Sequence, residues 1–432
     1  RRQRQMCIRD SQQVFGIKEL WGIDFFWIAA IGLVVLTALY TIFGGMKSVL
    51  YTSVLQTPIL LLGSLIILVL GFKELGGWDE MMRVCGAVTV NDYGDTMTNL
   101  IRSNDDANFP WLGALIGSAI IGFWYWCTDQ FIVQRVLSGK NEMEARRGTI
   151  FGAYLKLLPV FLFLIPGMIA FALHQKYIGA GGEGFLPMLA NGTANADAAF
   201  PTLVAKLLPA GVKGLVVCGI LAALMSSLAS LFNSSAMLFT IDFYKRFRPE
   251  TPEKKLVGIG QVATVVIVIL GILWIPIMRS VGDVLYTYLQ DVQSVLAPGI
   301  AAAFLLGICW KRTSAQGGMW GLIAGMVIGL TRLGAKVYYS NAGEVADSTF
   351  KYLFYDMNWL FFCGWMFLFC IIVVIVVSLA TKAPTAEKIQ GLVFGTATKE
   401  QKAATRASWN HWDIIHTVII LAITGAFYWY FW

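Results

Sequence analysis

Charged residues are scarce in this 432-residue chain. Asp, Glu, Lys and Arg make up 14% of it, against about 25% in a soluble domain. Hydrophobic residues make up 57%. A soluble fold of this length would need a far more charged surface, so the composition excludes that class. We therefore expect an all-α polytopic membrane protein whose apolar side chains face lipid.

Histidine is also rare, and the cysteines do not form a disulfide framework. Three His leave little room for haem ligation or a histidine metal centre, and most of the seven Cys lie inside apolar runs. The sequence contains no Walker A glycine loop and no nucleophile–base pair. We therefore expect no enzymatic activity and no cofactor. The net charge of +7 is assigned to cytoplasmic loops rather than to nucleic acid binding.

Long apolar runs dominate the chain. A helix that crosses the hydrocarbon core needs about 20 apolar residues. Ten runs are long enough, and we expect spans at 24–45, 48–71, 111–137, 149–174, 211–241, 256–278, 283–310, 315–337, 354–381 and 411–432.

Basic residues set the expected orientation. They cluster in the loops after the odd-numbered spans, as in 135–147 and 245–255, whereas segment 72–110 is acidic. The positive-inside rule places the basic loops in the cytoplasm, so the first span begins on the extracellular or periplasmic side. The basic segment 1–23 would then lie outside, and we interpret it as non-native or external; an ordinary basic tail is the alternative.

Three small or hydroxyl-bearing residues share a helical face in the fifth predicted span. Ala223, Ser226 and Ser227 are spaced i, i+3 and i+4. Two hydroxyls and a backbone carbonyl are hard oxygen ligands of the kind that Na⁺ needs. The alternative is a small-residue helix contact in which each serine bonds to the carbonyl four residues earlier. Both readings stay open on the pattern alone.

Aromatic and polar residues alternate in the third span. Tyr125 and Trp126 precede Asp129, and Arg135 follows in the same segment. Aromatic rings can stack on the apolar face of a sugar, although an interfacial aromatic belt gives the same pattern. Because charges are costly in lipid, we assign Asp129 and Arg135 to a cytoplasmic-side polar network rather than to substrate.

Polar groups at membrane depth also occur in the fourth and seventh spans. Lys156 lies within an apolar run and must snorkel, pair or line a cavity. Tyr286, Gln290 and Gln293 precede a Pro-Gly step that predicts a kinked helix. The two amides share a face at i, i+3 and are the strongest pointer to a hydrogen-bonding substrate site. Interrupted helices with polar groups at the midplane are typical of secondary transporters.

Five segments carry a family resemblance. They are GLVVLTALYTIFGGMKSVLYTSVLQT at 32–57, WYWCTDQFIVQRVLSGKN at 124–141, GAYLKLLP at 152–159, LAALMSSLASLFNSSAMLFTIDFY at 221–244 and YLQDVQSVLAPGIAAAFLLGICWKR at 288–312. In this order they resemble the sodium/glucose cotransporters of the sodium:solute symporter family.

The resemblance implies a LeuT-like fold of two inverted five-helix repeats. It assigns 24–71 to the last two helices of the first repeat, 111–310 to the second repeat, and 315–432 to peripheral C-terminal helices with a cytoplasmic loop at 382–410. It also implies that the first three core helices are missing from this chain.

The resemblance implies residue roles as well. Ser226 and Ser227 match the sodium-site serines, and Ala223 contributes its carbonyl. Tyr125 matches the inner gate, beside Trp126, while Lys156 and Gln290 match the sugar site, near Tyr286 and Gln293.

Three departures from the family pattern concern sodium and solute, the first two sodium and the third the solute. Many members carry Asp where this chain has Ser53, and members that couple two sodium ions often have Thr in place of Ala229. Both departures favour one sodium ion per cycle. Gln293 replaces a common Thr, which leaves the solute open among glucose, galactose, another hexose and myo-inositol.

The expected function is sodium-coupled symport of a small neutral sugar across the plasma membrane by alternating access. The alternatives are a symporter for myo-inositol or another non-sugar solute, and a solute sensor on the same fold. The expected partners are Na⁺, a sugar or polyol and the lipid bilayer, and the oligomeric state is not predicted.

Overall fold

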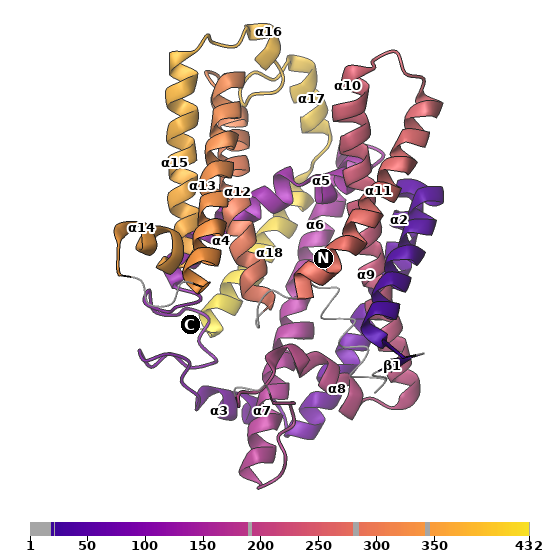
Figure 1. The fold of residues 1–432 in the computed structure, drawn as a ribbon, viewed down its shortest axis with the longest axis vertical. Helices are drawn as coiled ribbons and strands as arrows, with labels where there is room; N and C mark the ends of the chain where they lie inside the picture. The colour runs from indigo at the N-terminus through magenta and orange to yellow at the C-terminus, as the bar shows by residue number, and fades with distance from the viewer. Residues whose placement is uncertain (1–18, 21, 189–191, 280–284, 342–345, 432) are drawn as a thin grey trace. The chain divides into compact units, whose positions relative to one another are not determined.

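Helices account for most of the described backbone in the computed structural model (Figure 1). It describes residues 19–20, 22–188, 192–279, 285–341 and 346–431. The sheet in these residues is one short antiparallel pair, β1 (Glu19–Leu20) with β2 (Ile23–Asp24). Among the described residues, ten helices are long and apolar enough to cross a membrane. The predictions of an all-α membrane fold and of ten spans are confirmed. Most of segment 1–23 lies outside the described residues.

The spans are built from nine stretches of helix. They are α2 (Phe25–Leu75), which holds two spans; α4 (Trp111–Phe123) with the π-helical turn η1 (Trp124–Thr128); α6 (Glu142–Pro159), η2 (Val160–Leu164) and α7 (Ile165–Gly179); α9 (Ala210–Leu238), η4 (Phe239–Tyr244) and α10 (Lys245–Phe247); α11 (Glu253–Arg279); α12 (Leu285–Cys309); α13 (Ala315–Asn341); α15 (Trp359–Ala380); and α18 (His411–Tyr430).

Short helices connect the spans. They are α3 (Trp78–Gly86), α5 (Gln130–Leu137), η3 (Ala196–Ala198), α8 (Ala199–Leu207), α14 (Thr349–Lys351), η5 (Tyr352–Asp356), α16 (Ala386–Ile389) and α17 (Lys399–Ala407).

The two spans of α2 are separated by a glycine. Gly45 has φ 55° and ψ −157°, a conformation that a residue with a Cβ rarely adopts. The first span therefore ends at Gly45 and the second begins at Val49, close to the predicted boundary between 45 and 48.

The third span is shorter than the sequence predicts. Asp129 has an extended backbone, φ −73° and ψ 118°, so the helix stops at Thr128 and α5 starts afresh at Gln130. The predicted boundary at 137 is therefore wrong, and the span runs over Trp111–Thr128. The apolar pattern continues through α5, which hides this break from a hydropathy reading.

The chain forms two compact units. The first comprises 1–89, 96–98 and 155–285, and the second comprises 90–95, 99–154 and 286–432. These units follow packing rather than sequence order. The repeat boundaries that the family resemblance implies are not tested by this division and stay predictions.

The first unit is built around α2 and α9. These two helices run side by side, with α11 against both (Figure 1). Leu224, Leu228 and Phe232 recur every four residues on α9, so they form one stripe that packs on Ala30 and Val34 of α2. This stripe fixes the face that α9 turns toward α2.

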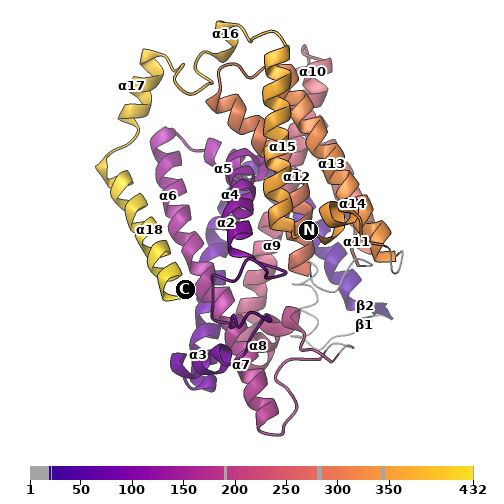
Figure 2. The same cartoon turned by 90° about the vertical axis from the view of Figure 1, so that its left-hand side faces the viewer.

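The second unit is built around α13 and α15, which lie side by side (Figure 2). Helix α12 crosses α13 closely at two glycines. A Cβ on Gly325 would lie 2.9 Å from the Cα of Gly299, which is closer than real Cβ atoms approach backbone. Small residues at such crossings let membrane helices approach until their backbones touch.

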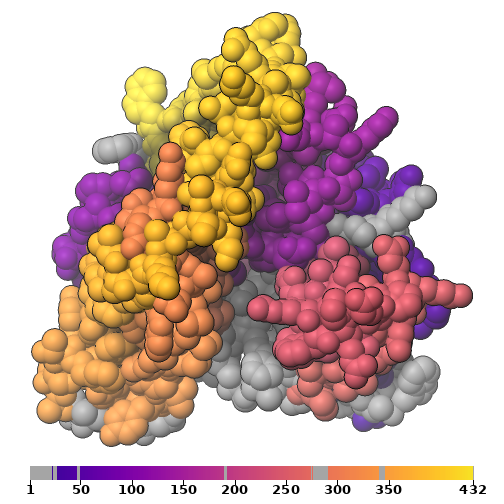
Figure 3. Space-filling view, turned by 90° about the horizontal axis from the view of Figure 1, so that it is seen from above, coloured from indigo at the N-terminus to yellow at the C-terminus, as the bar shows by residue number. Residues whose placement is uncertain are grey.

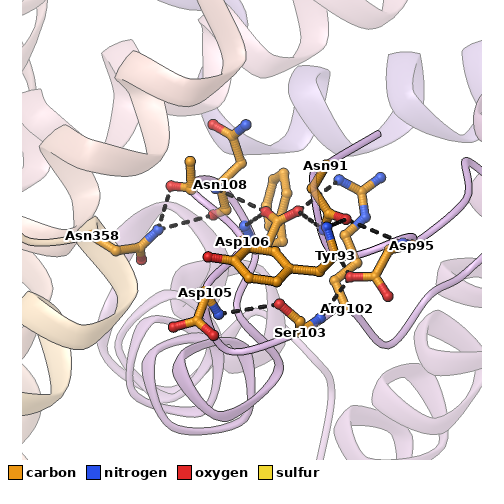
Figure 4. A network of polar contacts seen from close by, with 11 residues as sticks. Asn91, Tyr93, Asp95, Arg102, Ser103, Asp105, Asp106, Asn108 and Asn358 are labelled. Carbon is orange, nitrogen blue, oxygen red and sulfur yellow. Dashed lines mark hydrogen bonds and ion pairs between the residues drawn. The ribbon is translucent and has the colours of Figure 1, made fainter. Parts of the chain in front are cut away.

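The connection from α3 to α4 is held by its own polar side chains (Figure 4). The amide of Asn91 donates to Asp95 at 2.7 Å and to Asp106 at 3.2 Å. The backbone N–H of Ser103 and the Asn91 amide hold the pKa of the Asp95 carboxyl below its usual value. Because that pKa is depressed, the contribution of these bonds is complete at neutral pH and is lost only in acid, below about pH 4.

The segment between α15 and α18 lies over one end of the second unit, where Figure 3 shows it in yellow against the orange helices. The backbone N–H of Phe394 donates to Ile308 in the last turn of α12, at 2.7 Å. Arg146 of α6 donates to Ser408 at 3.1 Å. These bonds attach the predicted loop 382–410 to the ends of the spans.

The glycine crossing predicts a sharp difference between two alanine substitutions in α13. Gly325→Ala should lower the free energy of unfolding by about 1–3 kcal/mol, because the added Cβ forces α12 away. Gly318→Ala on the same helix meets open space and should change it by less than about 1 kcal/mol. Thermal unfolding of the purified full-length protein checks this, and equal melting temperatures for the two variants would contradict it.

Candidate functional site

Two serines meet between the spans of the first unit. Ser226 on α9 is 7% exposed, and its Oγ lies 2.5 Å from the Oγ of Ser53 on the second span of α2. Ser53 also donates to the carbonyl of Val49 at 2.7 Å. Since that bond uses the single proton of Ser53, the Ser53 oxygen accepts from Ser226. The pair leaves oxygen lone pairs inside the span.

Further oxygens lie near this pair along the same helices. Gln56 follows Ser53 by three residues, so the two share a helical face. Its Oε1 is buried and has no hydrogen-bond partner in the described part of the chain. On α9, the carbonyl of Met225 accepts from the Tyr40 hydroxyl at 2.8 Å. Neutral hydroxyl and amide oxygens suit a hard cation such as Na⁺ and not a soft metal.

Ser53 and Gln56 are not among the sodium ligands predicted from the sequence, where Ser53 marks only the loss of a family carboxylate. The available signal was their spacing, since residues at i and i+3 share a helical face. The partner of Ser53 on α9, 173 residues later in the chain, could not be read from one sequence.

The other two predicted sodium ligands lie on the same helix. Ala223 is half-buried, and the side chain of Ser227 is exposed. Consecutive residues on a helix differ by about 100° in direction, so Ser226 and Ser227 point to different sides of α9. The structure places Ser226 against α2; the role of Ser227 and of the Ala223 carbonyl stays a prediction.

Tyr125 and Trp126 lie in the π-helical turn η1 of the second unit. The N–H of Asp129 bonds to the carbonyl of Trp124, five residues earlier, at 3.1 Å. This wider turn precedes the break, and π-turns of this kind are frequent at functional sites. The rings of Tyr125 and Trp126 are perpendicular, with centroids 5.4 Å apart, and Trp126 is half exposed.

The predicted polar network at Asp129 and Arg135 has a local explanation. Asp129 is the N-cap of α5, and its carboxylate accepts from the N–H of Phe131 at 3.0 Å. The Arg135 guanidinium lies 5.3 Å from the centre of the Phe131 ring. Both side chains therefore stabilise the start and body of α5, and a wider network stays a prediction.

The two amides of the seventh span lie on one side of α12 in the second unit. Gln290 and Gln293 are both half-buried. Between them, Asp291 is paired: its carboxylate contacts Lys336 at 2.5 Å and Arg332 at 3.4 Å, both on α13. The two amides are uncharged neighbours of this ion-paired carboxylate, and their role toward a solute stays a prediction.

Tyr286 and Lys156 are the remaining predicted substrate residues. The side chain of Tyr286 lies outside those that the structure describes. Lys156 is exposed on α6 and belongs to the first unit, whereas Tyr125, Trp126, Gln290 and Gln293 belong to the second.

Interrupted helices and buried neutral oxygens within ten spans define a class, that of secondary transporters. The sodium:solute symporter family model matches residues 13–325. The chain belongs to the sodium:solute symporter family. It is therefore a multi-pass membrane protein of a family of Na⁺-coupled transporters, and not of a family of enzymes.

Curated relatives agree on this family. The chain is 35% identical to a Bos taurus sodium/mannose cotransporter, over 94% of this chain and 72% of that protein. It is 35% identical to the Homo sapiens sodium/myo-inositol cotransporter 2, over 86% of this chain and 56% of that protein. It is 38% identical to the Ovis aries sodium/glucose cotransporter 1, over 84% of this chain and 57% of that protein. The chain thus spans little more than half of the last two relatives.

A solved structure has the same fold. A Na⁺-coupled sialic acid symporter, in a substrate-bound outward-open state, matches with a TM-score of 0.66 at 21% identity, over 89% of this chain and 73% of that one. The prediction of a LeuT-like fold is confirmed.

Two substitutions distinguish an N-capping role of Asp129 from a role of its negative charge. Asp129→Ala should lower the free energy of unfolding by about 1 kcal/mol, because α5 loses its N-cap. Asp129→Asn should leave it nearly unchanged, since Asn caps as well as Asp. Thermal unfolding of the full-length protein measures both. If Asn destabilises as much as Ala, the negative charge matters and a network with Arg135 is favoured.

Proposed function

We propose that the full-length protein couples the inward transport of a neutral sugar or polyol to Na⁺ across the plasma membrane by alternating access. The observation that carries the proposal is the buried Ser53–Ser226 hydroxyl pair between two spans, in a chain of the sodium:solute symporter family. The relatives named above transport mannose, myo-inositol or glucose with sodium, and all three solutes are neutral polyols.

The proposed sodium site uses Ser226 and Ser53, with Ser227 and the Ala223 carbonyl as further ligands. Na⁺ competes with the Ser226–Ser53 hydrogen bond, whose net contribution is only about 1 kcal/mol. The hydroxyl of Ser226 turns, and both oxygens then face the ion. Because Ser53 keeps its bond to Val49, its oxygen is already oriented for this role.

The proposed solute site uses the amides of Gln290 and Gln293, with Tyr125, Trp126 and Tyr286 of the same unit. An amide both donates and accepts, which matches the hydroxyl groups of a polyol. The exposed ring of Trp126 offers a face for the C–H side of a sugar. An anionic solute would favour a positive group, and the two cations nearest to these amides on α13 are already paired with Asp291.

Alternating access then couples the two sites. Na⁺ must bind the outward-open state more tightly than the inward-open one, since a ligand with equal affinity for both shifts nothing. Solute binds next, Tyr125 opens as the inner gate, and both leave on the cytoplasmic side. A solute sensor on the same fold is the second candidate, and it differs in binding solute without uptake.

Uptake by the full-length protein in proteoliposomes tests the proposal. Labelled mannose, glucose and myo-inositol are offered with an inward Na⁺ gradient and with choline in place of Na⁺. At least one solute should accumulate only with Na⁺. Binding without accumulation would favour the sensor, and accumulation independent of Na⁺ would contradict the proposal.

The sodium site predicts a selective effect of one serine. Ser226→Ala should raise the Na⁺ concentration for half-maximal uptake about tenfold, because one ligand to a charged ion contributes roughly 1.4 kcal/mol. Ser234→Ala is the matched control: it is also buried on α9, but its hydroxyl donates only to the carbonyl of Leu231. An unchanged Na⁺ dependence in Ser226→Ala would remove Ser226 from the site.

The solute site predicts the complementary effect. Gln290→Ala should raise the solute concentration for half-maximal uptake at least about tenfold, because solute hydroxyls lose a partner in a desolvated site. The half-saturating Na⁺ concentration should change less. Gln316→Ala, an exposed amide on α13, is the control. Equal shifts for Na⁺ and solute would argue against Gln290 as a solute ligand.

A further inference from the structure

Asp291 is the carboxylate next to the proposed solute ligand Gln290. It is 7% exposed, and both of its oxygens are engaged: Oδ2 with Lys336 at 2.5 Å and Oδ1 with Arg332 at 3.4 Å. Arg332 is fully buried. A carboxylate held by two cations is not available to a solute or to Na⁺. Its energy instead depends on where α12 sits against α13.

Arg332 extends the contact to a third element. Its Nη2 donates to the carbonyl of Met357 at 2.8 Å, and its guanidinium lies 4.0 Å from the centre of the Phe362 ring. Met357 follows η5, and Phe362 is in the first turns of α15. Arg332 therefore fixes α13 to the start of α15, and through Asp291 it fixes α12 to both.

The same junction is tied to the connection between α3 and α4. Asn358, directly after Met357, is the N-cap of α15. Its side-chain amide donates to the carbonyl of Ala107 at 2.7 Å (Figure 4). That connection is stabilised by the Asn91, Asp95 and Asp106 bonds described above. The start of α15, which Arg332 contacts, is thus hydrogen-bonded to a connection that its own polar side chains hold in place.

The faces of α12 explain how this anchoring reaches Gln290. Asp291, Val295 and Gly299 are spaced four residues apart and face α13, where Val295 meets Gly329 and Gly299 meets Gly325. Gln290 points about 100° away from Asp291 around the helix. A glutamine tip lies about 5–6 Å from the helix axis, so a rotation of about 10° moves it by about 1 Å.

A rotation of that size matters for a hydrogen-bonding site. A misplacement of about 1 Å can cost up to about a hundredfold in a positioned interaction. The Gly299–Gly325 contact sets the distance between α12 and α13 but resists rotation weakly, because neither residue has a side chain to interlock. The ion pairs are directional, since both carboxylate oxygens are satisfied in one orientation only.

We propose that Asp291 and Arg332 are positioning residues of the solute site, which hold α12 in the rotation that presents Gln290. This inference rests on the proposed function, because it assigns Gln290 to solute. The sodium ligands are on α2 and α9 in the other unit, so the effect is specific to solute. Two apolar side chains in place of Asp291 and Arg332 would fill the same space but would not fix the rotation of α12.

The test compares Asp291→Asn and Asp291→Glu in the full-length protein in proteoliposomes. The probe is whichever of mannose, glucose and myo-inositol the wild type accumulates. Asp291→Asn should raise the half-saturating solute concentration at least tenfold. Its Na⁺-induced rise in melting temperature, measured without solute, should match the wild type. Asp291→Glu should recover part of the solute affinity, because it restores the charge at a shifted position.

Two further variants keep the result interpretable. Asp347→Asn breaks an exposed ion pair with Lys351 and should leave both measurements unchanged. If Asp291→Asn does not yield folded protein, Arg332→Lys replaces it. It keeps the charge but loses the planar fork, in which Nη2 contacts Asp291 and Met357 while Nη1 contacts Leu353. It should raise the solute half-saturation severalfold without changing the response to Na⁺.

The outcomes separate the two proposals. A wild type that accumulates no solute with Na⁺ overturns the proposed function and, with it, this inference. A transporting wild type whose folded Asp291 or Arg332 variant keeps its solute half-saturation overturns this inference alone. Equal loss of the solute and Na⁺ responses also overturns it, since that result marks a purely structural role.

Discussion

The hydrocarbon of the membrane offers no hydrogen bonds, and the structure of every span follows from that constraint. Each polar group must find its partner inside the protein. Thr37 and Thr41 donate to the carbonyls four residues earlier on α2, and Asp291 takes two cations. A buried polar atom without such a partner is therefore informative. The Oε1 of Gln56, one turn from Ser53, is such an atom among the described residues, and a cation is the partner it suits.

The same constraint explains what the sequence could predict. Apolar length gave ten spans, because an uncharged run of 20 residues has few alternatives to a membrane helix. The boundary between the first two spans was also predicted closely, and the structure places there Gly45, in a conformation that residues with a Cβ rarely adopt. The end of the third span was misjudged. Residues 130–137 continue the apolar pattern, but Asp129 caps a new helix there, and capping is a local choice that hydropathy does not detect.

The candidate site was harder to predict because its contacts join distant parts of the chain. The serine pattern at 223–227 indicated the right helix but not which hydroxyl faces α2. That choice depends on the face of α9 that carries Gly219, seven residues before Ser226, which packs closely on Ile59 and Leu60 of the second span of α2. A carboxylate at membrane depth such as Asp291 needs a partner, but its partners are 41 and 45 residues away on α13. A single sequence gives the need for a partner and not its identity.

The replacement of a family carboxylate by Ser53 has an electrical consequence in the proposed transport cycle. With neutral ligands only, the sodium site carries no charge when empty and one positive charge when loaded. The membrane potential then acts on the loaded step, at about 2.3 kcal/mol per charge per 100 mV, and leaves the return of the empty carrier unaffected. A carboxylate at this position would have the opposite effect. The empty site would carry one negative charge and the loaded site none, so the membrane potential would act on the return of the empty carrier. The hydroxyl pair therefore lowers the Coulombic attraction for Na⁺, and it places the voltage dependence on the step that moves solute inward.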